Sequence, residues 1–171
     1  VEIKELEVNV ALGLTDPPEG AFTDPRHPKL GWRLYSIDAE KFNQPINWTK
    51  LRVDYVIPEY GSELTGESYI LEMGFERLNG VDFKKGCYVG QEVTARMKHK
   101  TELHKGLVKI SSEETMVNGE ELFLNDKPIG SVLTVYDRSA LAYVRLKNRD
   151  EILSTKSTKR IFVDTNPISS N

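Results

Sequence analysis

Alternation of apolar and polar residues dominates the chain from about residue 105 onward. A period of two places every second side chain on the same face of a β-strand. Tight turns separate the alternating segments, with Asn125-Asp126 typical of a hairpin and Asp137-Arg138-Ser139 forming another turn. Several short strands joined by such turns predict a small antiparallel β-barrel or sandwich. The predicted strands are Leu107–Ile110, Glu121–Leu124, Lys127–Tyr136, Ala140–Leu146 and Lys159–Val163.

The first hundred residues mix strand and loop patterns. Leu6 to Val10 and Leu30 to Ile37 read as strands. Proline-rich and glycine-rich stretches between them predict loops. His27 lies between prolines in one of these loops, so we interpret it as a loop residue and not as a ligand.

Two helices are predicted between these strands and residue 80. Asn47 is a suitable N-cap for the first helix, which Pro58 should end. A second, shorter helix is predicted from Ile70 to Leu78, closed by Asn79-Gly80. The apolar stripe expected to bury the first helix consists of Trp48, Leu51, Tyr55 and Val56.

The patterns predict an α+β fold with a boundary near Lys100. We expect a mixed α/β part over residues 1–100, a β-barrel domain over residues 101–165 and a polar tail over residues 166–171. No apolar run approaches the roughly 20 residues that a membrane-spanning helix needs, so no membrane association is expected.

The chain has one cysteine, Cys87, which excludes an internal disulfide and favours a reducing compartment such as the cytosol or the mitochondrial matrix. It also excludes a complete zinc or iron–sulfur site, and we predict no metal site. The net charge of −3 argues against general nucleic-acid binding. Residues 84–105 nevertheless carry four more basic than acidic side chains, which suits an anionic ligand or an acidic partner, or simply a solvated helix face.

Cys87 lies in the segment KKGCYVGQEVTAR, residues 84–96. Gly86 and Gly90 allow a tight turn around it, and the residues after Gly90 suit a helix in which Glu92 and Arg96 form a favourable i, i+4 pair. Positive charge and helix-entrance N–H groups favour a thiolate, so a reactive cysteine is one reading. The alternative is that Cys87 is a small buried hydrophobe and that Tyr88 is a core aromatic.

The sequence KGCYVGQE resembles the KGCYxGQE signature of the YgfZ family, which is related to the glycine-cleavage T-protein and includes mitochondrial Iba-type iron–sulfur assembly factors. The stretches Phe22 to Arg33, Leu51 to Gly61, Glu72 to Phe83 and Ile129 to Arg145 are also similar to the family. The resemblance implies that roughly a hundred residues, about one compact domain, precede Val1.

This resemblance implies a T-protein-like, aminomethyltransferase-related folate-binding body over residues 1–100, followed by the barrel. It implies a monomer that binds tetrahydrofolate, works with iron–sulfur assembly or client proteins, and supports iron–sulfur enzymes, including tRNA-modifying ones. The residues implied in the reaction are Cys87, Lys85, Tyr88, Gln91 and Glu92. Those implied in folate binding are Arg52, Glu72, Lys84, Gly86, Gly90 and Arg96, with Glu72 accepting the pterin donors and Arg52, Lys84 and Arg96 binding the glutamate tail.

Two positions depart from the family pattern. Val56 stands where a glycine often precedes the hydrophobic residue and proline, and Gly74 stands where a polar residue is usual. Three other functions stay open. The chain could be a T-protein-type aminomethyltransferase, whose catalytic aspartate would lie ahead of Val1. It could be a thiol enzyme pairing Cys87 with His99 or His104. It could also be a pure binding module.

Overall fold

The computed structural model describes residues 7–100, 103–148, 153–156 and 159–164. The described residues up to Trp48 form one compact unit, and those from Thr49 to Asp164 form a second. The predicted boundary near residue 100 separates the barrel strands from what precedes them, yet residues 49–100 pack in the same compact unit as the barrel.

The first unit is built on a three-stranded antiparallel sheet. Its strands are β1 (Asn9–Gly13), β2 (Phe22–Thr23) and β3 (Trp32–Ser36), in the order β1-β3-β2. The strand predicted over residues 30–37 is therefore confirmed as β3 in its central part, whereas Leu30 belongs to a 3-10 turn. The strand predicted from Leu6 begins instead at Asn9, and Leu6 itself lies outside the described residues. Short 3-10 turns, Pro28–Leu30 and Ala39–Phe42, complete the unit.

One face of this sheet carries the core of the first unit, in which Trp32 and Leu34 of β3 pack with Ala11 and Ala39. The other face projects Val10, Arg33 and Tyr35 outward, as the period of two requires. His27 is a loop residue, as predicted. It caps the first 3-10 turn, and its Nδ1 accepts a hydrogen bond from the Lys29 N–H at 3.1 Å.

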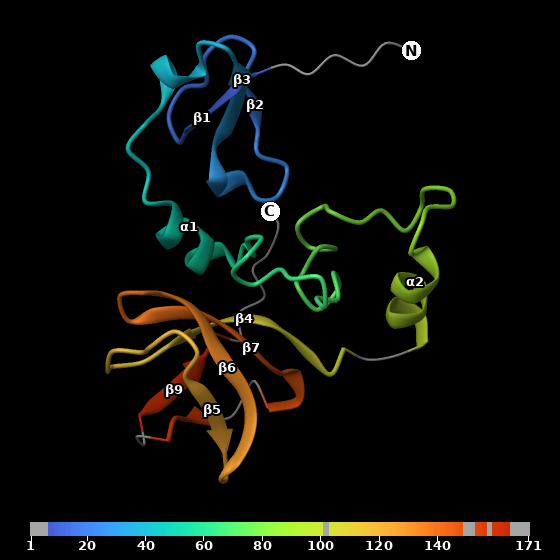
Figure 1. Ribbon diagram of the computed structural model, residues 1–171, viewed down its shortest axis with the longest axis vertical. Coiled ribbons are helices and arrows are strands. Elements are labelled where there is room, and N and C mark those ends of the chain that lie inside the picture. Colours follow the sequence, from blue (N-terminus) through green and yellow to red (C-terminus); the bar gives the residue numbers. More distant parts are fainter. Residues whose placement is uncertain (1–6, 101–102, 149–152, 157–158, 165–171) are drawn as a thin grey trace. The chain divides into compact units, whose positions relative to one another are not determined.

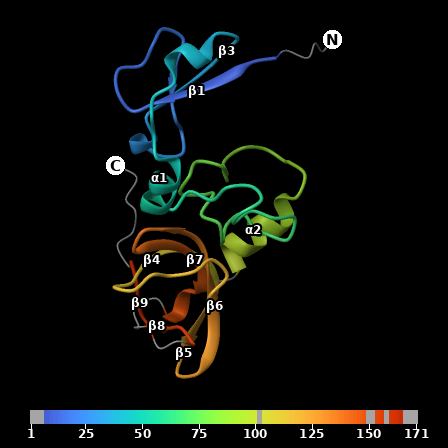
Figure 2. The ribbon, with the colours of Figure 1, turned by 60° about the vertical axis from the view of Figure 1, so that its left-hand side comes forward.

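The second unit contains a closed antiparallel barrel, which confirms the prediction from the alternating segments (Figure 1). The strands follow the order β4-β7-β6-β5-β8-β9 around it, and Figure 2 shows the same barrel turned by 60°. Strand β8 was not predicted, because two residues are too short to show a period. The strands are β4 (Lys105–Ser111), β5 (Glu121–Leu124), β6 (Lys127–Tyr136), β7 (Ser139–Arg145), β8 (Leu153–Ser154) and β9 (Arg160–Val163).

Inward-facing side chains of all these strands fill the barrel, among them Ile110, Leu122, Val132, Val144, Leu153 and Ile161. Both predicted turns are confirmed. Asn125 and Asp126 have φ angles of 48° and 62°, and Asp137 has 52°, values that short polar residues tolerate. Gly130 is required by close packing of β6 on β7, because a Cβ atom there would lie 2.3 Å from the Tyr143 carbonyl oxygen.

Helix α1 (Trp48–Tyr55) packs on the outside of the barrel. Val53 and Val56 form a buried cluster with Leu141 of β7, and Leu107 and Leu133 pack against it. This explains why residues 140–142 are all buried, since the barrel core covers one face of β7 and the α1 cluster covers the other. The predicted stripe was therefore only partly correct. Trp48, Leu51 and Tyr55 are half-buried at its flank, and Arg52, Val53 and Val56 make the buried side.

Helix α1 ends at Tyr55, before Pro58, because Val56 adopts a φ of 52° and leaves the helical conformation. The half-buried guanidinium of Arg77 then satisfies two carbonyl groups at this end. It donates from Nη1 to the Tyr55 oxygen (3.1 Å) and from Nη2 to the Val56 oxygen (2.7 Å). Burial lowers the pKa of Arg77. Val56 thus takes a left-handed conformation that a glycine would adopt more easily.

The helix predicted from Ile70 to Leu78 was wrong. The chain forms two successive turns, each closed by a residue with positive φ, Gly74 at 78° and Asn79 at 57°. Backbone hydrogen bonds from Phe75 N to Ile70 O and from Gly80 N to Phe75 O close the two turns. Gly74 divides the segment because its left-handed conformation ends the first turn, whereas the predicted closure at Asn79-Gly80 is confirmed.

Candidate functional site

The segment that carries Cys87 is a loop followed directly by helix α2 (Gln91–Lys100), as predicted. Gly90 has a φ of 82° and stands at the entrance of the helix. Two local hydrogen bonds hold this entrance. The Tyr88 N–H donates to the Gln91 side-chain oxygen at 3.1 Å, and the Thr94 hydroxyl donates to the Gly90 carbonyl at 3.4 Å. The loop conformation therefore follows from its own residues and not from burial.

Cys87 is exposed, which contradicts the reading of this cysteine as a small buried hydrophobe. Its neighbours Lys84, Lys85 and Gly86 are exposed as well, and Val89 is fully exposed. Tyr88 is half-buried, and the Lys85 ammonium lies 4.5 Å from the centroid of its ring. The thiol thus stands in a basic environment that solvent and a partner molecule can reach.

Glu92 and Arg96 bind each other across one turn of α2, with Arg96 Nη2 donating to Glu92 Oε1 at 2.6 Å. This is the i, i+4 pair that the sequence predicted, and both side chains are exposed. Lys84 donates its backbone N–H to Asp82 at 2.8 Å and leaves its side chain in solvent. Predicted residues 84–92 and Arg96 are therefore brought together in one loop-helix.

His99 packs its ring edge-on against Phe83, with centroids 6.4 Å apart. His104 is exposed just before β4. No contact of Cys87 with either histidine occurs among the interactions that the structure describes, so a thiol–imidazole pair has no support in the geometry. Within the described part of the chain, no group of three or more His, Cys, Asp or Glu residues is placed to hold a metal ion.

Arg52 lies apart from the other predicted site residues. It is only 3% exposed, and it donates to the Ile57 carbonyl, to Glu59 and to Glu63. Glu63 is equally buried and accepts further hydrogen bonds from Thr134 of β6 and from the Glu59 N–H. Because two carboxylates already bind the Arg52 guanidinium, few of its N–H donors remain for the carboxylates of a folate tail. Arg52 instead links α1 to the barrel through Glu63, which accepts a hydrogen bond from Thr134.

Glu72 is half-buried and accepts a hydrogen bond from the Tyr143 hydroxyl of β7. Burial raises the pKa of Tyr143 strongly, and the adjacent Glu72 carboxylate raises it further, so the phenol stays protonated and donates. The Lys105 ammonium lies 5.6 Å from the centroid of the same ring. Sequence reasoning missed Tyr143, because 71 residues separate it from Glu72 and no local pattern links them.

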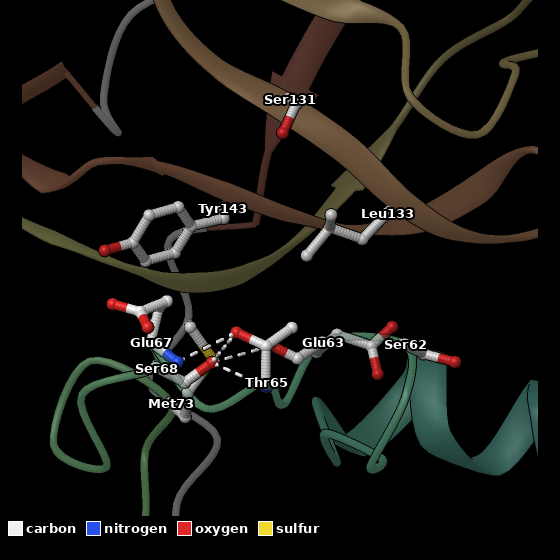
Figure 3. A pocket seen from close by; sticks show the side chains of 9 residues that line it. All are labelled: Ser62, Glu63, Thr65, Glu67, Ser68, Met73, Ser131, Leu133 and Tyr143. Atoms are coloured by element: carbon white, nitrogen blue, oxygen red, sulfur yellow. Dashed lines mark hydrogen bonds between the residues drawn. The ribbon is translucent and has the colours of Figure 1, made fainter.

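Tyr143 also lines a cavity of about 280 Å³ between residues 62–73 and the outer surface of the barrel. Figure 3 shows Ser131, Leu133 and Tyr143 on the barrel side, facing the loop side chains across the space. Met73 and Leu133 supply apolar surface, and hydroxyl and carboxylate groups supply the polar lining. A few polar groups in a partly apolar hollow are typical of a small-molecule site. The loop residues are Ser62, Glu63, Thr65, Glu67, Ser68 and Met73.

Comparison with known proteins agrees with the barrel. Residues 104–168 match the CAF17 C-terminal beta-barrel domain. The described strands β4 to β9 lie within or at the edge of this range. The chain is also similar to proteins named as iron–sulfur cluster assembly factors.

The chain is 37% identical over 98 residues to the mitochondrial iron–sulfur cluster assembly factor IBA57 of Mus musculus, covering 53% of this chain and 27% of the relative. It is 36% identical over 98 residues to the IBA57 homologue of Neurospora crassa, covering 52% and 22%. The human protein is 37% identical over 92 residues, covering 49% and 26%. The matched part thus spans about a quarter of the length of these relatives. In the described residues, no helix has the length and apolarity to cross a bilayer.

Proposed function

We propose that this protein supports iron–sulfur cluster assembly through Cys87 and binds tetrahydrofolate, with a body like that of the T-protein. The enzymes that benefit would include iron–sulfur enzymes that modify tRNA. The exposed thiol on a basic loop-helix is the observation that carries the proposal. The names of the similar proteins, which are iron–sulfur cluster assembly factors, support it independently.

One thiolate cannot hold a cluster alone, because the common clusters need four ligands. Cys87 would therefore supply one ligand to a cluster, or one nucleophile, in a complex whose other ligands come from a partner. The exposed Lys84 and Lys85 beside it suit an acidic partner surface. The names of these relatives call them mitochondrial, and a matrix location, if the protein is eukaryotic, belongs to the same proposal.

Folate would bind with its pterin at Glu72, which accepts a hydrogen bond from Tyr143, one of the residues that line the cavity. A carboxylate accepts two parallel N–H donors of an aminopyrimidine through both oxygens. Glu72 Oε2 accepts from Tyr143, whereas its Oε1 has no partner in the described part of the chain. The pterin would therefore compete with the Tyr143 hydroxyl for one oxygen. Of the residues implied in tail binding, Lys84 is the one whose charge is unpaired among the described contacts.

The cysteine is tested by Cys87→Ser, with Val89→Ser as the matched control in the same loop. We expect Cys87→Ser to abolish support of iron–sulfur enzymes in cells while changing stability by less than about 0.5 kcal/mol, since the side chain is exposed. Val89→Ser should keep full activity. Normal iron–sulfur enzyme activity in cells that carry only the serine variant would refute the proposed role of Cys87.

The folate site is tested by calorimetric titration with tetrahydrofolate. Glu72→Gln should weaken binding about tenfold or more, because hydrogen bonds to charged groups contribute roughly 1.5–3 kcal/mol. Tyr143→Phe should keep or strengthen binding, because it frees the second carboxylate oxygen. Glu76→Gln, an exposed acid four residues away, is the control. Equal affinities of the wild type and Glu72→Gln would show that the pterin binds elsewhere.

A further inference from the structure

The first unit contains a buried carboxylate that holds two arginines. Asp24 is only 2% exposed. Arg26 donates to it from Nε at 3.0 Å and from Nη2 at 2.7 Å, and Arg33 donates from Nε at 2.7 Å. Burial alone would raise the pKa of Asp24, but the hydrogen bonds from the two arginines outweigh it and hold the pKa below its ordinary value. Both guanidinium groups are therefore fixed in place by one ionised acid.

Two guanidinium groups on one carboxylate leave a net positive charge. Among the described contacts, Nη1 of Arg26 and Nη2 of Arg33 have no acceptor, and the two side chains are 28% and 23% exposed. Trp48 lies against both groups, with its ring centroid 5.3 Å from the Cζ of Arg26 and 6.0 Å from that of Arg33. The ring restricts the two groups further and covers part of their surface. The unused N–H donors remain available to a ligand.

An exposed aromatic pair adjoins these arginines on the outer face of the sheet. The rings of Phe22 and Tyr35 stack with centroids 5.6 Å apart and planes 11° apart. Each residue is about half exposed, at 48% and 47%. Arg33 lies opposite Phe22 in the register of β2 and β3, and its Nη1 donates to the Tyr35 hydroxyl at 3.4 Å. Exposed stacked rings beside fixed arginines are a surface on which a flat ring can lie.

Fewer side chains than the two arginines and the aromatic residues around them would neutralise the charge of Asp24. One bidentate arginine satisfies a buried carboxylate, and Arg26 already does so with two side-chain hydrogen bonds. The second arginine, Arg33, adds a charge for which the described ion pairs give no carboxylate other than the shared Asp24. The exposed aromatic pair contributes little to the core, which lies on the opposite face of the sheet. Arginines whose direction is fixed in advance lose little entropy when they bind an oxyanion.

We propose that Arg26 and Arg33 form a binding site for an oxyanion, a phosphate or carboxylate group, carried on a molecule with a flat ring. The oxyanion accepts hydrogen bonds from the free Nη groups, and the ring stacks on the Phe22–Tyr35 pair. Asp24 and Trp48 position the arginines and do not touch the ligand. The site uses residues of the first unit alone and stands independently of the roles proposed for Cys87 and Glu72.

Three probes test the site on the intact chain, namely inorganic phosphate, adenosine monophosphate and p-aminobenzoylglutamate. Binding is followed by calorimetry and by the NMR shifts of the arginine Nε–H groups. We expect saturable binding of at least one ring-bearing probe with a Kd of about 1 mM or tighter, and weaker binding of phosphate alone. The Nε–H signals of Arg26 and Arg33 should shift on binding. The preferred probe then distinguishes a nucleotide source from a benzoylglutamate source.

Arg26→Gln and Arg33→Gln should each weaken binding about tenfold, since each removes a charge-assisted contact. Each variant leaves the other arginine paired with Asp24, and circular dichroism checks that the fold is kept. Lys29→Gln removes an equal charge from an exposed position in the same loop and should leave affinity unchanged. The proposal is overturned if no probe saturates, or if Lys29→Gln weakens binding as much as the arginine variants do.

Discussion

The barrel and the segment from residue 57 to residue 90 are held together in different ways. Barrel residues form continuous ladders of backbone hydrogen bonds around a hydrocarbon core. The segment has no helix or ladder of its own and consists of turns fixed by side chains, such as Arg52 with Glu63, and Arg77 with the end of α1. The candidate functional groups Glu72 and Cys87 lie in this segment. A loop fixed by specific contacts on a rigid barrel can present reactive groups without burying them.

The largest stability loss is expected where the segment depends on a single buried ion pair. Arg52→Met leaves the Glu63 carboxylate buried without its cation, and removal of one partner of such a pair costs about 3–5 kcal/mol. Chemical denaturation measures the free energy of unfolding. Arg52→Met combined with Glu63→Gln should regain part of the loss, because the uncompensated charge is gone. A loss below about 1 kcal/mol for the single variant would show that the segment does not depend on this pair.

The barrel should instead be sensitive to cavities in its core. Ile161→Ala deletes fully buried carbon atoms from β9 and should lower the free energy of unfolding by about 2–5 kcal/mol. Val117→Ala is the control, since Val117 is 61% exposed and its loss should stay within about 0.5 kcal/mol. If both variants unfold at the same denaturant concentration as the wild type, the barrel core does not determine stability.

A smaller loss of stability is expected at Val56, between the end of α1 and the segment that begins at residue 57. Val56→Gly removes a buried side chain but relieves a left-handed conformation that costs a β-branched residue roughly 1–2 kcal/mol. The net loss should be about 1 kcal/mol. Val53→Gly removes an equally buried valine from regular helix and should cost about 3 kcal/mol, because no strain is relieved. Equal losses in the two thermal or denaturant unfolding curves would contradict this account.

The smallest effect is a pH dependence at the contact between α1 and β4. Burial alone would raise the pKa of Asp54, but hydrogen bonds from Lys109 (2.8 Å) and Lys50 lower it below its ordinary value of 3.8. A depressed folded-state pKa gives stability that is present above the ordinary pKa and is lost as pH falls through the folded value. Asp54→Asn should therefore remove up to about 1 kcal/mol near neutral pH and nothing in strong acid. An equal loss at both pH values would exclude the ion pairs as its cause.

Local sequence signals predicted some parts of the candidate site correctly. The loop around Cys87, the helix after Gly90 and the Glu92–Arg96 pair depend on residues at most a few positions apart, and the structure has all three. Arg52 was assigned to the glutamate tail of folate because the resemblance to the family implies a folate ligand, whose carboxylates need arginine or lysine. Its burial with Glu63, 11 residues later, could not be seen from a helical pattern.

The sequence by itself determined the barrel, its two polar turns and the loop before α2, because strand period, turn chemistry and helix entry are local properties of the chain, whereas the exposure of Cys87 came from the structure. Only the tertiary structure decided which side of α1 is buried, that residues 70–78 form turns, and that Glu72 meets Tyr143 or that Asp24 holds two arginines. These outcomes depend on side-chain contacts across loops or between separate elements, or on one left-handed residue, and neither leaves a periodic signal in the sequence.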